Sequence, residues 1–175
     1  MKKYRNNTST RKNLESAISD EAISHVKYTL WGKRAKAEGY PEIAHCYEVA
    51  AKNELSHAEA CMNELGLIGS IYENLQTSAE MVKEGIEQYI SFAYDAENEG
   101  YDELKTMFLS ASDAERNHME SFLSLHEKYI SDEMFSSPLA DTRWMCYNCG
   151  FVSEGETPPE NCPLCGRPQT WFVKK

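Results

Sequence analysis

The 175-residue sequence is poor in positive charge and has no long apolar run. It holds 18 Lys and Arg against 28 Asp and Glu, which gives a formal net charge of −10. That balance argues against a nucleic-acid-binding protein, because such proteins usually display a basic patch. No run of about 18 apolar residues is present, so we expect no membrane-spanning helix. The basic start lacks the apolar stretch of a secretory signal. We therefore expect a cytoplasmic protein that binds neither nucleic acid nor membrane.

Proline is missing from a long central part of the chain. None occurs between Pro41 and Pro138, which permits long uninterrupted helices. The last 33 residues, by contrast, hold four of the six prolines and four of the six cysteines. A short polar stretch at 131–142 separates the two compositions. The sequence therefore predicts a helical domain at residues 1–136, followed by a linker and a small cysteine-containing domain at 137–175.

Hydrophobic spacing and glycine positions predict four helices in the first domain. Ser9 or Thr10 is expected to cap the first helix. The expected ranges are 10–36, 41–65, 78–98 and 101–129. Tight turns join the first helix to the second and the third to the fourth, so each pair should be antiparallel, and the longer stretch 66–77 should cross between the pairs. The predicted fold class is mainly α, a four-helix bundle with a small C-terminal metal-knuckle domain.

An internal repeat with an offset of 61 residues relates the two expected hairpins. The recurrences are Tyr28 with Tyr89, Glu38-Gly39-Tyr40 with Glu99-Gly100-Tyr101, and Glu54-x-x-His57 with Glu115-x-x-His118. Residues three apart share a helix face, so each Glu-x-x-His pair aims a carboxylate and an imidazole at one point. A single such pair would ordinarily be solvated surface. Its duplication at one offset favours a metal centre.

Carboxylates and imidazoles in this pattern suit a pair of metal ions. Carboxylates can bridge two cations while each imidazole supplies a nitrogen. Di-iron carboxylate bundles use one Glu from each of two helices and Glu-x-x-His from each of the other two. The first expected helix offers Glu21 for this role. The third offers three candidates, namely Glu80, Glu84 and Glu87.

The C-terminal cysteines form two knuckles of matching sequence. Cys146-x-x-Cys149 and Cys162-x-x-Cys165 are each followed by glycine, which lets the backbone turn its amides toward sulfur. Four thiolates suit zinc or a single iron, and so small a domain needs the metal to fold. A structural zinc ribbon is the alternative to a redox site. Five aromatic residues that could pack around the sulfurs favour the redox site: Trp144, Tyr147, Phe151, Trp171 and Phe172. The other two cysteines, Cys46 and Cys61, are expected to be small core or boundary residues.

With both motifs in place, the chain resembles the rubrerythrins over nearly its whole length. The stretches that carry the resemblance are KYTLWGKRAKAEGYPEIA, NELSHAE, AYDAENEGYDEL, AERNH and WMCYNCGFVSEG with CPLCG. The resemblance implies a ferritin-like di-iron four-helix bundle followed by a rubredoxin-like domain. The implied di-iron ligands are Glu21, Glu54, His57, Glu84, Glu115 and His118. The implied ligands of a single iron are Cys146, Cys149, Cys162 and Cys165.

One position departs from the pattern of the family. Rubrerythrins commonly carry two carboxylates three residues apart on the third helix, and matching on the repeated tyrosine places them at Met81 and Glu84. Methionine cannot replace a bridging carboxylate. Either Glu80 reaches the site through a local helix distortion, or the site has one carboxylate fewer. His25, four residues after Glu21, either compensates for the loss or is an ordinary neighbour.

The resemblance also implies an activity. A rubrerythrin-type peroxidase would reduce hydrogen peroxide to water, with electrons delivered through the cysteine-bound iron, in defence against oxidative stress. Tyr28 and Tyr89 would hydrogen-bond near the bound oxidant, although core packing explains them equally well. The resemblance suggests a head-to-tail homodimer. A separate reductase would supply electrons from pyridine nucleotide, because no Gly-rich dinucleotide motif is present.

Two other functions remain open at the level of sequence. One is a ferritin-like protein that oxidises or handles iron and carries a structural zinc tail. The other is an electron-transfer or interaction protein whose di-metal site is degraded at Met81.

Overall fold

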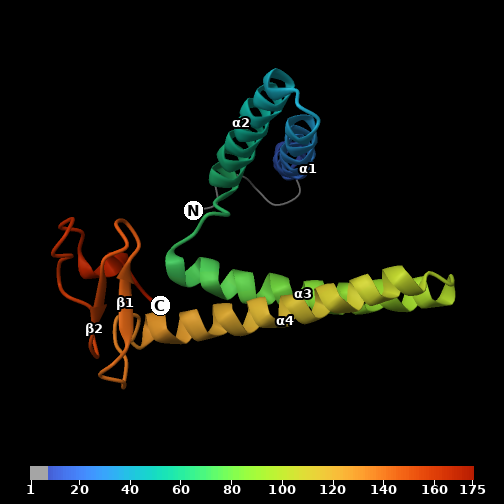
Figure 1. Cartoon of the computed structure of the whole chain (residues 1–175). Coiled ribbons are helices and arrows are strands. Elements are labelled where there is room, and N and C mark those ends of the chain that lie inside the picture. The colour runs from blue at the N-terminus through green and yellow to red at the C-terminus, as the bar shows by residue number, and fades with distance from the viewer. Residues whose placement is uncertain (1–7) are drawn as a thin grey trace. The chain divides into compact units, whose positions relative to one another are not determined.

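The computed structural model describes residues 8–175 and contains the four expected helices (Figure 1). They are α1 (Ser9–Ala37), α2 (Pro41–Leu65), α3 (Ile71–Asn98) and α4 (Asp102–Ile130). The predicted ends at the two glycine turns are confirmed, because Gly39 and Gly100 adopt φ angles of 83° and 81° that favour glycine.

Two predicted helix starts are wrong. The cap of α1 is Thr8, whose hydroxyl accepts from the backbone N–H of Arg11 at 3.3 Å. Helix α3 begins at Ile71, well before the predicted residue 78, because Ser70 and Glu73 form a capping box. The Ser70 side chain accepts from the Glu73 backbone N–H, while the Glu73 carboxylate accepts from the Ser70 N–H at 2.8 Å. This reciprocal cap satisfies backbone donors that would otherwise be unpaired.

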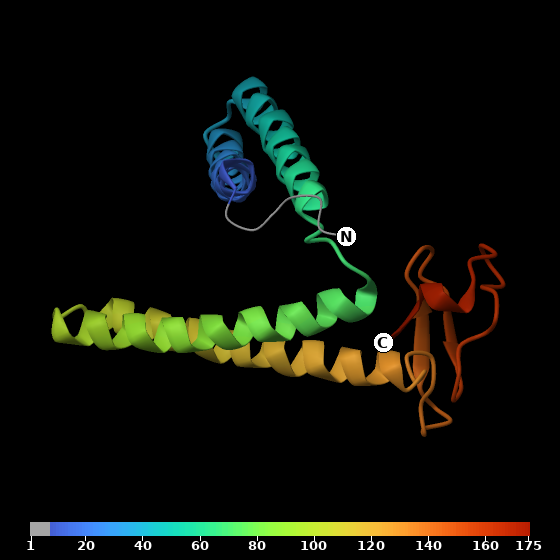
Figure 2. The same ribbon diagram turned by 180° about the vertical axis from the view of Figure 1, so that it is seen from behind.

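The described chain divides into two compact units, one up to Gly69 and the other from Ser70 onward. In the first unit, α1 and α2 pack against each other as an antiparallel hairpin. In the second, α3 and α4 form a hairpin of the same kind, and the cysteine-containing segment follows α4 (Figure 2). Each unit is described by itself below.

Small residues allow the helices of each hairpin to approach closely. Gly32 is buried in α1, and a Cβ there would lie 3.3 Å from Cβ of Tyr47 and 3.5 Å from the Ala44 carbonyl oxygen. The residue 61 positions later, Ala93, is 3% exposed on α3. The internal repeat therefore includes the interface between the two helices of each hairpin as well as the sequence motifs.

A cluster of three aromatic rings is duplicated as well. In the first hairpin, ring centroids lie 5.7–5.9 Å apart among Tyr28, Trp31 and Tyr47. In the second, they lie 5.6–6.3 Å apart among Tyr89, Phe92 and Phe108. Each ring has its counterpart at the same offset of 61, so the two hairpins share packing that the sequence motifs alone did not reveal.

The cysteine-containing segment forms a small antiparallel sheet. Its strands are β1 (Arg143–Cys146), β2 (Val152–Glu154) and β3 (Phe172–Lys174), in the order β2-β1-β3, with a short 3-10 turn η1 (Gln169–Trp171) before β3. Trp144 is fully buried beside the cysteines, and its indole N–H donates to the Gly155 carbonyl at 2.9 Å. The predicted fold class is confirmed as mainly α with a small C-terminal knuckle domain. The boundary at residue 136 stays a prediction.

Candidate metal centres

The two cysteine knuckles have nearly the same backbone geometry. The amide of Gly150 donates to the Cys146 carbonyl and that of Gly166 to the Cys162 carbonyl, both at 2.8 Å. Both glycines have positive φ angles, 76° and 71°, which favour residues without a Cβ. Each knuckle therefore bends sharply after its second cysteine, and this brings the two pairs of thiols together.

The four sulfur atoms are spaced as ligands of one tetrahedral ion. Sγ of Cys146 lies 3.7 Å from that of Cys165, and Sγ of Cys149 lies 3.6 Å from that of Cys162. Metal–sulfur bonds of about 2.3 Å in a tetrahedron place the sulfurs roughly 3.8 Å apart. A disulfide would need about 2.0 Å. The cysteine set therefore fits a metal, and no disulfide forms among the described residues.

The surroundings of the thiols favour one thiolate before any metal arrives. The backbone N–H of Arg167 lowers the pKa of Cys165 to about 6, and the Asn148 side chain acts in the same direction. At Cys149 the N–H of Phe151 also lowers the pKa, but desolvation and the neighbouring thiols together raise it to about 12. Metals bind the thiolate form, so the backbone amides of the knuckles assist binding. Sequence reasoning missed Asn148, although its place between two ligands was a usable signal.

The aromatic residues near the cysteines divide into two groups. Trp144 and Phe172 are buried against the sulfurs, and Phe151 packs at their edge. Tyr147 is 75% exposed, and Trp171 is 36% exposed with the Arg167 guanidinium 4.3 Å from its ring centre. The expectation that all five surround the sulfurs is therefore too broad, because Tyr147 in the first knuckle and Trp171 at the end of η1 are exposed.

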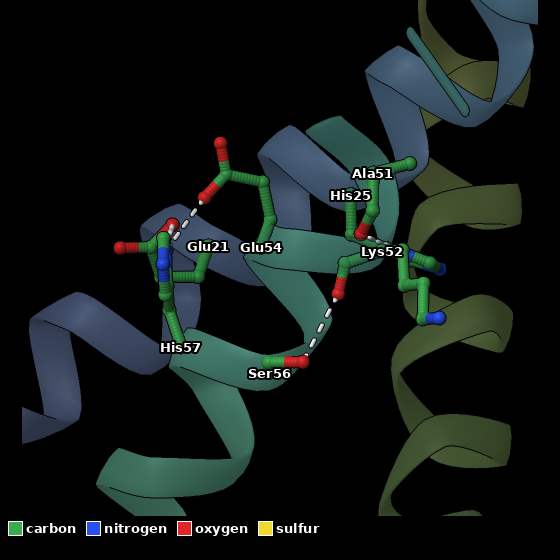
Figure 3. A network of polar contacts seen from close by, with 7 residues as sticks. All are labelled: Glu21, His25, Ala51, Lys52, Glu54, Ser56 and His57. Atoms are coloured by element: carbon green, nitrogen blue, oxygen red, sulfur yellow. Dashed lines mark hydrogen bonds and ion pairs between the residues drawn. The ribbon is translucent and has the colours of Figure 1, made fainter. Parts of the chain in front are cut away.

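The first hairpin brings three expected ligands together. Nδ1 of His57 lies 3.0 Å from Oε2 of Glu54, one turn away on α2, and 3.7 Å from Oε2 of Glu21 on α1. One ligand atom from each lies within 4.8 Å of the others, and Figure 3 shows the three side chains converging on one side of the hairpin. Two carboxylates and an imidazole at this spacing form a suitable site for a divalent cation.

The two carboxylates of this group are close enough to share a proton. The hydrogen bond with Glu54 raises the pKa of Glu21, and desolvation adds to the rise. The same hydrogen bond lowers the pKa of Glu54, and His57 lowers it further. Two adjacent carboxylates cannot both ionise freely without a cation. A metal ion at this point would take the place of the shared proton.

The second hairpin brings together fewer of its expected ligands. Nδ1 of His118 lies 3.3 Å from Oε2 of Glu115. No third ligand joins them in the described chain, where metal-type groups of three or more are found only at the cysteines and in the first hairpin. Glu84 is exposed on α3, and Met81 is 65% exposed. The ligand role of Glu84 therefore stays a prediction.

The proposed compensations for Met81 find no support in the geometry. Helix α3 is continuous, and Oε1 of Glu80 accepts a hydrogen bond from Gln76 of the same helix at 3.3 Å. Nδ1 of His25 donates to the Ala51 carbonyl at 2.7 Å, and its ring lies apart from Glu21 in Figure 3. Helix α3 thus shows no distortion, and His25 is hydrogen-bonded within its own hairpin.

The two candidate catalytic tyrosines lie within the aromatic clusters. Tyr28 comes seven residues after Glu21 on α1, which is two turns or about 10 Å along one helix face. Tyr89 holds the corresponding place on α3. Both are half-buried. Core packing is thus visible for both, and their catalytic role stays a prediction.

Comparison with known proteins identifies both parts of the chain. The family model described as "Rubrerythrin" matches residues 12–84 and 73–147, and the "Rubrerythrin, rubredoxin-like domain" model matches 144–173.

No helix of the described chain is both long and apolar enough to cross a membrane.

Curated relatives match over most of their length. Rubrerythrin of Nitratidesulfovibrio vulgaris is 33% identical over 177 residues, covering 93% of this chain and 92% of the relative. Rubrerythrin of Porphyromonas gingivalis is 32% identical over 186 residues, covering 98% and 92%. A solved structure titled "Partially Reduced State of Nigerythrin" is 28% identical, covers 98% of this chain and 88% of that one, and has a TM-score of 0.37.

Sequence matches and site geometry agree on the cofactors. The four cysteines form the metal site of a rubredoxin-like domain, and the Glu and His groups form a site for di-iron. The family supports an oxidoreductase with a rubredoxin-linked role in oxidative stress. The chain belongs to the rubrerythrin family.

Proposed function

We propose that this protein is a peroxidase that reduces hydrogen peroxide to water with electrons delivered through a cysteine-bound iron. The observation that carries the proposal is the presence, in one chain, of the Glu21, Glu54 and His57 group and of a tetrahedral set of four sulfurs. The carboxylate and imidazole group suits a metal that reacts with an oxidant. The four sulfurs suit a metal that gains and loses one electron.

Each side chain has a definite task in this proposal. Glu54 on α2 and Glu115 on α4 would each contribute a carboxylate to the metal pair, and His57 and His118 would each contribute one nitrogen. When bound in the reduced state, the iron pair supplies the two electrons that cleavage of the peroxide O–O bond requires. The hydroxyl groups of Tyr28 and Tyr89 are proposed to donate hydrogen bonds to the oxidant, and the surrounding rings of their clusters exclude water.

Electrons are proposed to enter through the knuckles. Cys165 is exposed, and two neighbouring apolar side chains, Tyr147 and Leu164, are 75% and 68% exposed. Such a surface allows close approach by an electron-donating reductase. In a head-to-tail homodimer, the same surface would face the helical part of the second subunit.

A cytoplasmic location is part of the proposal and is supported by six cysteines that all remain unpaired.

The proposal is tested by anaerobic stopped-flow mixing of the fully reduced, iron-loaded chain with hydrogen peroxide. Fast oxidation of the cysteine-bound iron is expected in the wild type. Glu115→Ala should abolish that fast phase, because it removes a carboxylate from the helical metal site, and should leave the colour of the cysteine-bound iron. Glu103→Ala, a change at an exposed position of the same helix, is the matched control. Full peroxide turnover by Glu115→Ala would overturn the assignment.

The ferritin-like alternative predicts a different outcome from the same samples. An iron-handling protein would oxidise added ferrous iron far beyond the content of its sites and would carry zinc at the cysteines. Such iron turnover without peroxide-dependent oxidation of the cysteine-bound metal would favour that alternative.

A further inference from the structure

The two hairpins carry unequal sets of metal-binding groups, although an internal repeat relates them. In the first hairpin, ligand atoms of Glu21, Glu54 and His57 lie within 4.8 Å of one another. In the second, Glu115 and His118 approach to 3.3 Å, and across residues 8–175 no further carboxylate, imidazole or thiol completes a group with them. One hairpin thus offers three ligands already in place, and the other offers two.

The missing third ligand has an identifiable position on α3. The residue 61 positions after Glu21 is Val82, and matching to the rubrerythrin pattern gives its neighbour Met81. Neither offers the oxygen or nitrogen that a hard divalent cation prefers. The flanking carboxylates Glu80 and Glu84 lie two residues from position 82, which turns each of them about 200° away around the helix. Counted from Met81, Glu84 lies three residues on and shares its helix face, but in the described chain it forms no metal-binding group with Glu115 and His118. In either register, the described part of α3 therefore places no third ligand beside that pair.

The number of ligands held in place decides the affinity for a divalent cation. Ligand charge and rigidity set binding strength, and a group assembled before binding needs little rearrangement. In the first hairpin, Glu54 and His57 are fixed one turn apart on α2, and Glu21 reaches them from α1 at 3.7 Å. The second hairpin has a matching pair on α4 but no counterpart from α3.

We propose that the α1–α2 hairpin is the primary metal site of this protein and binds the first divalent cation. The α3–α4 hairpin then provides a weaker second site. When metal is limiting, protein with a single metal ion bound to its helices therefore accumulates. The binding order stands on the ligand geometry. The effect of this order on activity rests on the proposed function. Peroxide reduction by a metal pair would require the second cation, so the activity would depend on the metal concentration.

Manganese(II) titration of the full chain tests this order directly. The cysteine site is filled beforehand with one iron or zinc, which its thiolates prefer over manganese. The electron paramagnetic resonance signal of free manganese then reports each binding step, and the bound signal distinguishes a single ion from a coupled pair. The wild type is expected to bind in two steps whose dissociation constants differ by at least about tenfold.

The internal repeat provides matched variants for the titration. His57→Ala should weaken the first step by at least about tenfold, whereas His118→Ala, the same change 61 residues later, should weaken only the second. Val82→Glu, or Met81→Glu in the alternative register, should strengthen the second step and leave the first unchanged. Far-ultraviolet circular dichroism confirms that each variant keeps its helices.

Specific results would overturn the proposal. One such result is equal dissociation constants for the two steps in the wild type. Another is that His118→Ala weakens the first step as much as His57→Ala does. If neither new carboxylate strengthened the second step, the missing ligand would not be its cause. A protein that binds in two unequal steps but does not reduce peroxide would contradict the proposed function and leave the binding order intact.

Discussion

At the scale of single residues, proton and metal compete for the same carboxylates. The pKa of Glu21 is raised and that of Glu54 lowered, first of all by the hydrogen bond between them. The pair thus holds one proton to a higher pH than an isolated glutamate would. A cation that binds Glu21 and Glu54 must displace this proton, so protons and metal are linked at this site.

We predict that manganese binding to the first site weakens as the pH falls toward the raised pKa of Glu21. A raised pKa means that Glu21 is protonated below a higher pH than usual, and its protonated form does not bind the cation. Above that pKa the proton is gone and the affinity should level off. Titration at several pH values measures this, and Glu21→Ala should bind more weakly but with a smaller pH dependence. Equal pH dependence in both proteins would contradict the shared proton.

At the scale of elements, helix ends are set by local hydrogen bonds more than by hydrophobic spacing. The capping box of Ser70 and Glu73 starts α3 at Ile71, whereas spacing alone suggested a start at residue 78. The earlier start adds nearly two turns to α3. One of the added residues is Tyr72, whose ring packs 4.8 Å from that of His126 on α4. The cap thereby decides how far the second hairpin extends.

Ser70→Ala is expected to destabilise the first turn of α3 by about 1 kcal/mol, because the Glu73 backbone N–H loses its acceptor. Hydrogen exchange should accelerate at the amides of Tyr72 and Glu73 and change little near the turn at Gly100. Thr77→Ala, a similar truncation at an exposed position inside the same helix, is the control. Equal exchange in the two variants would show that the capping box does not determine where α3 begins.

At the scale of the whole molecule, two kinds of stabilisation coexist. The hairpins are held by close helix packing along small residues such as Gly32 and Ala93. The cysteine domain has a buried hydrophobic cluster of only four residues, two of them metal ligands: Trp144, Cys146, Cys162 and Phe172. So small a core cannot maintain the domain without the metal.

Removing the metal with a chelator should therefore unfold the cysteine domain and spare most of the helices. Trp144 is fully buried, so its fluorescence should shift to the red, while far-ultraviolet circular dichroism should lose little helical signal. Cys162→Ser should reproduce this result, and Cys46→Ser should not. Retention of the buried Trp144 signal after complete metal removal would contradict the dependence on metal.

The metal itself decides whether electrons can pass through this domain. Iron in a tetrahedral sulfur site is red, whereas zinc is colourless and has no redox chemistry. We expect the purified protein to be red and to contain iron at its four-cysteine site, in addition to any metal held by the helices. A colourless protein with zinc in this site would contradict the proposed electron route and would favour the iron-handling alternative.

Much of the fold and of the candidate sites was predictable, because their signals are local or repeated. The Cys-x-x-Cys-Gly knuckles and the Glu-x-x-His pairs place ligands within one turn of backbone, where spacing alone fixes which side chains meet. The aromatic cluster of Tyr28, Trp31 and Tyr47 was not predictable as a unit, because it depends on the register between α1 and α2. The Ser-x-x-Glu spacing of Ser70 and Glu73 is also a local signal, and it indicates the observed start of α3.

The sequence by itself determined the class of the protein: four long helices, two metal motifs and membership of the rubrerythrin family. Only the tertiary structure decided how the ligands group. It brings Glu21 to Glu54 and His57, and it turns His25 to the Ala51 carbonyl instead. Among residues 8–175 it places no third ligand beside Glu115 and His118. The physical reason is that contacts across a hairpin depend on helix register and rotation, which sequence spacing along a single helix does not specify.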